Sequence, residues 1–182
     1  MKDEASPVSM KVDASRLPAK GVTVKFEADE RQREALASHH GLEKVADFRF
    51  QAKVEPWKRE GARVTGEVKA DITQLCVVTL EPLQAKLVEE ISAVFVPEES
   101  RLARVDIEGG EILLDAEGDD APETFANNRI DIGALAEELF ELAIDPYPRA
   151  KGAKLPENAP QDEAETRSEA PFAKLGSLVR KS

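Results

Sequence analysis

The sequence predicts an α+β fold: an antiparallel, barrel-like β-sheet of about six or seven strands, covered by one main amphipathic helix, with a short second helix. Three observations predict it. Several stretches alternate apolar and polar residues, which is the period of a strand with one buried face. One later stretch carries apolar residues at helical spacing instead. The 182 residues also suffice for a domain that buries about 70% of its unfolded surface.

The alternation begins near the N-terminus. Val8, Met10 and Val12 alternate with polar residues and predict a short first strand. After a break at residues 17–21, a second strand is predicted over residues 22–28.

A short helix is predicted over residues 29–40. Asp29 and Gln32 have the spacing of a capping box, and a glycine follows the last turn. His39 and His40 lie in that last turn. Because neighbouring residues of a helix point about 100° apart, we interpret them as favourable charges at the helix C-terminus rather than as ligands of one metal ion.

The longest alternating runs cover residues 44–55 and 62–73. A polar turn at residues 58–61 joins them, which is a strong hairpin signal. The clean alternation indicates an antiparallel sheet with one buried and one solvated face. In the first run, the predicted buried face carries Ala46, Phe48, Phe50, Ala52 and Val54.

Residues 72–97 predict two strands joined at a corner, which Pro82 marks as a structural position. Cys76, the only cysteine, has the strand parity of the apolar Ile72, so we interpret it as a buried structural thiol. A single cysteine cannot form an internal disulfide, and the sequence places no base beside it.

The signal weakens between residues 98 and 128. Short strands are predicted at residues 104–107 and 112–114, and an acidic surface loop at residues 115–123. This loop has acidic residues at the first, third and fifth positions of a calcium-loop pattern. Asp120 and Ala126 replace the glycine and the glutamate that such a loop needs, so we interpret it as a solvated loop.

The main helix is predicted over residues 131–144. Asp131 is the expected N-cap, and apolar residues recur at helical spacing after it. The prolines at positions 146 and 148 prevent the helix from continuing. Its solvated face is predicted to carry Glu137, Glu138 and Glu141.

Composition changes after the helix. We expect one domain over residues 1–153 and a flexible tail over residues 154–182 that ends in a short basic amphipathic motif. From Arg149 onward there are seven basic and five acidic residues, a net charge of +2. Since the whole chain carries −11, the part before Arg149 carries −13.

The acidic charge makes the chain a poor general binder of phosphate backbones, although a local basic contact remains compatible with it. The sequence has no Gly-rich phosphate loop, no His-Glu-x-x-His and no Gly-x-Ser-x-Gly motif. It also has no apolar run typical of a signal peptide or a membrane span. We therefore expect a cytoplasmic, monomeric, non-enzymatic protein without a cofactor, a metal site or a small-molecule substrate.

Three motifs together resemble the YceD family, the large ribosomal RNA subunit accumulation proteins. The first is Cys76 followed by the Thr-Leu-Glu-Pro-Leu corner and a strand that ends in Phe-Val-Pro at residues 95–97. The second is IDIGALAEE at residues 130–138, which leads into DPYPR at residues 145–149. The third is the Pro-Phe-Ala segment at residues 171–178.

The resemblance implies the fold and a role in the synthesis, processing or stability of large-subunit (23S) ribosomal RNA, and it carries over no catalytic residue. Many members of the family have Cys-x-x-Cys at the corner. Here Thr79 occupies the second position, so a zinc or redox function built on that pair cannot operate in this chain.

We predict a factor that binds ribosomal RNA or an assembly partner. The alternative is a protein-binding adaptor that uses its acidic surface and C-terminal motif without contacting RNA. The residues predicted to bind are Arg149, Lys151, Lys154, Phe172, Lys174, Leu175, Arg180 and Lys181. The residues predicted to be structural are Cys76, Pro82, Asp131, Pro146 and Pro148.

Overall fold

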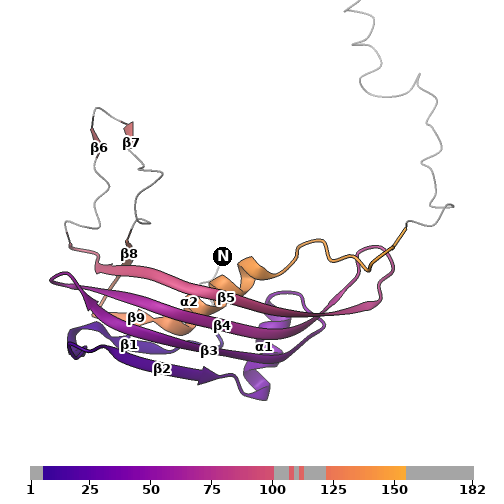
Figure 1. The fold of residues 1–182 in the computed structure, drawn as a ribbon, viewed down its shortest axis with the longest axis horizontal. Coiled ribbons are helices and arrows are strands. Elements are labelled where there is room, and N and C mark those ends of the chain that lie inside the picture. The colour runs from indigo at the N-terminus through magenta and orange to yellow at the C-terminus, as the bar shows by residue number, and fades with distance from the viewer. Residues whose placement is uncertain (1–5, 101–106, 109–110, 113–121, 155–182) are drawn as a thin grey trace, which may run out of the picture.

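The computed structural model describes residues 6–100, 107–108, 111–112 and 122–154. Its centre is a five-stranded sheet, which Figure 1 shows with the helices on one side. The strand order is β2–β3–β4–β5–β8. β2 to β5 are antiparallel to their neighbours, whereas β8 is parallel to β5. The bounds are Val22–Glu27 for β2, Lys44–Trp57 for β3, Gly61–Leu75 for β4, Pro82–Pro97 for β5 and Glu123–Phe125 for β8.

Two small antiparallel ribbons and the helices complete the described fold. β1 pairs with β9, and β6 pairs with β7. The bounds are Lys11–Asp13 for β1, Arg129–Asp131 for β9, Ile107–Glu108 for β6 and Glu111–Ile112 for β7. The 3-10 helix η1 covers Ala14–Arg16, α1 covers Glu30–His39 and α2 covers Ile132–Ala143.

The predicted α+β class, the antiparallel meander and both helices are confirmed. Among the described residues, however, the main sheet has five strands rather than six or seven, and it is not closed into a barrel. The first strand pairs with β9 instead of joining the main sheet, so it does not help to close that sheet into a barrel. Glu123, expected in a loop, begins β8, and the predicted strand residues 104–106 and 113–114 lie outside the described residues.

One face of the sheet forms the core because apolar side chains alternate along β3, β4 and β5. The alternation has one interruption, a register shift between Val45 and Asp47. This irregularity exposes Ala46, which was predicted to be buried, and buries Val45 in its place. The rest of the predicted face of β3 is confirmed, with Phe48, Phe50, Ala52 and Val54 all buried.

Both helices pack against this apolar face (Figure 1). α1 begins with the predicted capping box between Asp29 and Gln32. The Phe140 ring of α2 makes an edge contact with Phe48 of β3, at 5.4 Å between ring centroids. Within the described segments, no helix is long and apolar enough to cross a membrane.

Asp131 holds the N-terminal segment across the start of α2. Its carboxylate accepts hydrogen bonds from the Ala134 N–H as the helix cap, and from Ser9 and the Met10 N–H of the crossing segment. Gly133 makes this crossing possible, since a Cβ there would lie 1.9 Å from the carbonyl oxygen of Val8. The crossing therefore explains Asp131 and Gly133 of the DIG sequence at residues 131–133.

Asp131 gives a prediction of pH-dependent stability. Burial opposes its ionisation, but the hydrogen bonds from Ser9, Met10 and Ala134 outweigh burial and lower its pKa. A lowered folded-state pKa stabilises the fold above the unfolded value of about 4, and this stabilisation is lost as the pH falls through the folded value. We expect Asp131→Asn to reduce the free energy of unfolding by about 1 kcal/mol at neutral pH, since the site is partly solvated.

Urea unfolding followed by far-UV circular dichroism checks this prediction. The difference between the native chain and Asp131→Asn should shrink as the pH falls below about 4. As a control, Glu141→Gln removes an exposed carboxylate from the same helix. Its free energy of unfolding should differ little from that of the native chain at every pH. A constant Asp131→Asn difference from pH 7 to pH 2 would show that its charge does not stabilise the fold.

Candidate functional site

Two segments that are far apart in the sequence form one surface at the end of the sheet. The corner, residues 76–81, joins β4 to β5, and the exit segment, residues 145–150, follows α2. The Val77 N–H donates to the Pro148 carbonyl oxygen at 2.9 Å, and the Gln74 amide donates to the Asp145 carbonyl oxygen, also at 2.9 Å. These hydrogen bonds fix the exit segment against the corner.

Cys76 lies in the junction where the corner meets the exit segment. Its sulfur accepts the Ala150 N–H at 3.3 Å and the Thr79 N–H at 3.4 Å. These donors stabilise the thiolate, so hydrogen bonds from Ala150 and then Thr79 lower the pKa of Cys76 to about 7. The thiol is buried as expected, but the parity argument was wrong, because β4 ends at Leu75 and Cys76 begins the turn.

Exposed apolar side chains gather on this junction. Of the six large hydrophobic residues exposed in the described part of the chain, four lie at the end of β4, in the corner or in the exit segment. Leu80 and Tyr147 are 70% and 71% exposed. Leu80 also has a φ of 58°, a left-handed conformation that costs a leucine roughly 1–2 kcal/mol. A strained backbone that presents an exposed leucine is more typical of a recognition surface than of packing.

Basic side chains adjoin these apolar residues. Arg149, Lys151 and Lys154 are all exposed. Arg149 lies in the exit segment, and the two lysines follow it where the backbone turns at residues 150–153. We define the corner–exit surface by Leu75, Val77, Leu80, Tyr147, Arg149, Lys151 and Lys154.

The other predicted residues are placed as follows. Asp131 caps α2, while Pro82 starts β5 and is exposed. Pro146 is exposed in the exit segment, and Pro148 is half-buried there and accepts the hydrogen bond from Val77. The binding residues predicted further along lie outside the described residues: Phe172, Lys174, Leu175, Arg180 and Lys181.

The solvated face of the main sheet has a different character. Four of its basic residues pair with neighbouring carboxylates, as in the Lys53–Glu55 pair at 2.6 Å. A shallow hollow on this face is also lined by both signs of charge, including Arg49, Glu67 and Lys69. The remaining pairs are Arg49–Asp47, Lys69–Glu67 and Lys86–Asp71. The face is thus largely self-neutralised, which weakens any attraction for phosphate.

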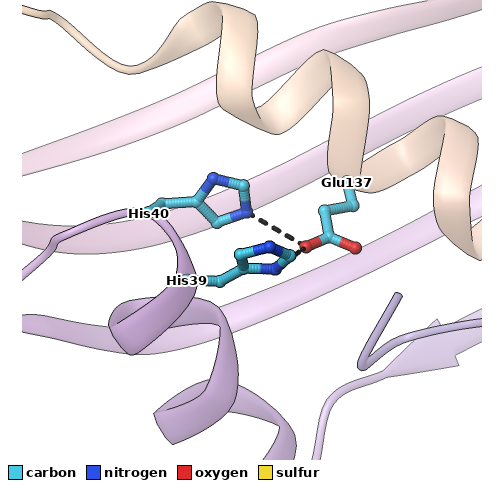
Figure 2. A group of neighbouring side chains, drawn as sticks. All are labelled: His39, His40 and Glu137. Atoms are coloured by element: carbon cyan, nitrogen blue, oxygen red, sulfur yellow. Dashed lines mark hydrogen bonds and ion pairs between the residues drawn. The ribbon is translucent and has the colours of Figure 1, made fainter. Parts of the chain in front are cut away.

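A second cluster lies between the two helices (Figure 2). His40 Nε2 lies 3.1 Å from Glu137 Oε1, and His39 Nδ1 lies 3.3 Å from the same oxygen. Glu137 was predicted to face solvent but is only 7% exposed, because the end of α1 covers it. The expectation that the two histidines diverge is also wrong: His40 is the C-cap of α1, with φ −100° and ψ 9°, so helical geometry does not separate the rings.

The cluster stabilises a buried carboxylate. Burial opposes ionisation of Glu137, but hydrogen bonds from His40 and Ser6, together with the charge of the histidines, outweigh it and lower its pKa. His40 also makes an edge contact with Phe140 at 5.3 Å between centroids. The donor atoms of His39, His40 and Glu137 lie within 4.8 Å of one another, and these side chains are of the types that bind transition metals.

The Cys76 junction yields a stability prediction. Cys76→Ala would leave the Ala150 and Thr79 N–H groups without their acceptor, so we expect the free energy of unfolding to fall by about 1–3 kcal/mol. Cys76→Ser keeps an acceptor and should cost less. Urea unfolding of the two variants checks this, and a Cys76→Ala variant as stable as the native chain would show that the sulfur does not hold the junction.

Comparison with known proteins identifies the family. Residues 64–179, well over half of the chain, match the family described as large ribosomal RNA subunit accumulation protein YceD. No curated protein and no solved structure gives a significant match. The matched region includes β4, the corner, β5, α2 and the exit segment, but neither of the two histidines. The resemblance found in the sequence motifs is therefore confirmed, and the chain belongs to the YceD family.

Proposed function

We propose that this protein supports the accumulation of large-subunit (23S) ribosomal RNA by binding that RNA, or a ribosome-assembly partner, through the corner–exit surface. The family description supports the role in large-subunit RNA. Beyond that role, the proposed place of action is the corner–exit surface, and the proposed mode of action is local binding without catalysis.

The observation that carries the proposal is the concentration of exposed apolar and basic side chains where the corner meets the exit segment. Tyr147 offers a flat aromatic face on which an unpaired base can stack. Arg149 and Lys151, two and four residues further along the chain, offer charges for phosphate oxygens. Since the chain as a whole carries −11, contact with RNA has to be confined to such a local patch.

The structure favours this surface over the solvated face of the sheet. There the basic residues described above already pair with carboxylates, so an RNA phosphate would have to displace them. The alternative of an adaptor with an acidic docking face loses support as well, because Glu137 is buried against the histidines. Glu138 and Glu141 of that predicted face remain exposed.

Crosslinking in cells followed by sequencing of the bound RNA tests the proposal. We expect the native chain to enrich large-subunit RNA and the double variant Arg149→Ala, Lys151→Ala to lose most of that enrichment. In vitro, we compare the slopes of log affinity against log salt concentration for binding to single-stranded large-subunit RNA. The slope of the double variant should be shallower than that of the native chain by about 1.4, for two lost phosphate contacts.

The matched control is Lys25→Ala, Arg63→Ala, which removes the same charge from the exposed face of the sheet and should bind normally. A chain without residues 171–182 tests the C-terminal motif in the same assay and should also bind more weakly. The proposal is contradicted if all variants enrich large-subunit RNA as strongly as the native chain does. Protein partners that stay bound after nuclease treatment would favour the adaptor instead.

A further inference from the structure

We propose that His39, His40 and Glu137 form a binding site for a divalent transition-metal ion of the zinc type. The site joins the end of α1 to the middle of α2 (Figure 2). It is separate from the corner–exit surface and independent of the function proposed for it.

Two of the three donor–donor distances fit one tetrahedral ion, and the donor atoms of all three side chains lie within 4.8 Å of one another. Imidazole nitrogens and carboxylate oxygens bind Zn²⁺ at about 2.0–2.2 Å, which places two such donors roughly 3.4 Å apart. The observed distances from Glu137 Oε1 are 3.1 Å to His40 Nε2 and 3.3 Å to His39 Nδ1. Either imidazole nitrogen can bind a metal ion, so the use of Nδ1 by one ring and Nε2 by the other is no obstacle.

Two of the three side chains, those of His40 and Glu137, are held in place before any ion binds, whereas His39 is half-exposed. The His40 and Glu137 side chains are almost fully buried, and the His40 ring packs edge-on against Phe140. Ser6 also hydrogen-bonds the Glu137 carboxylate, as a residue outside the ligand set does when it orients a ligand. Donors that need little rearrangement bind a metal ion with less loss of entropy.

The composition of the site decides the class of ion. Two imidazoles and one carboxylate suit zinc and neighbouring first-row metals, whereas calcium and magnesium prefer sites built from oxygen ligands alone. The His39 side chain is 47% exposed, so the cluster opens to solvent on that side. A water molecule or an exchangeable ligand can therefore take the fourth position there.

A bound ion would tie two parts of the chain together. Glu137 lies within the region matched to the family, whereas His39 and His40 precede it. The ion would thus fasten α1, with the N-terminal part of the fold, to the helix that leads into the exit segment.

Calorimetric titration of the chelator-treated full chain with Zn²⁺ tests the proposal. We expect one ion per chain, and at least ~100-fold weaker binding in His39→Ala and Glu137→Gln, since each removes a direct ligand. His39 is half-exposed, so its replacement should leave the fold intact by circular dichroism. Glu141→Gln removes an exposed carboxylate one turn further along α2 and should bind Zn²⁺ like the native chain.

Titration with Co²⁺ separates this site from Cys76. A tetrahedral Co²⁺ spectrum without thiolate-to-metal charge-transfer absorption is the expected result. The proposal is overturned if the native chain binds no Zn²⁺, if His39→Ala and Glu137→Gln bind it as the native chain does, or if the Co²⁺ spectrum shows a thiolate ligand.

Discussion

The packing of α2 on the apolar face of the sheet is the contact on which the rest of the structure depends. Phe140 lies between Phe48 of the sheet and His40 at the end of α1, so one ring joins three elements. Burying a phenylalanine side chain contributes about 1.5–3 kcal/mol, more than the roughly 0.5–1.5 kcal/mol of a typical hydrogen bond between neutral groups. Asp131 and the close crossing at Gly133 then fix where the helix begins.

Two functional consequences follow from that one placement. At its middle, α2 brings Glu137 under the two histidines and so creates the cluster between the helices. At its end, α2 directs the exit segment to the corner, where the Cys76 sulfur and the Val77 N–H bind its backbone. Both candidate sites are therefore products of the same helix, although they lie at different points along it and use different chemistry.

The sequence predicted what short-range patterns determine and missed what long-range contacts determine. The capping box at Asp29 and the cap at Asp131 were predictable because each depends on residues three apart. The burial of Glu137 was not, since helical periodicity assigns a glutamate to the solvated face and its partner His40 lies 97 residues away. The bulge that exposes Ala46 and the parallel pairing of β8 likewise leave no local signal. The exit residues were predicted to bind, but their hydrogen bonds to the corner were not.

The central claim is that the corner and the exit segment act as one binding surface. Hydroxyl-radical footprinting with and without large-subunit ribosomal RNA or precursor particles tests it most directly, because it measures the accessibility of side chains. Leu80 and Tyr147 should lose most of their oxidation together in the complex, while Val88, 59% exposed on the solvated face of β5, should keep its own. Protection of Val88 with Leu80 and Tyr147 unchanged would contradict the claim.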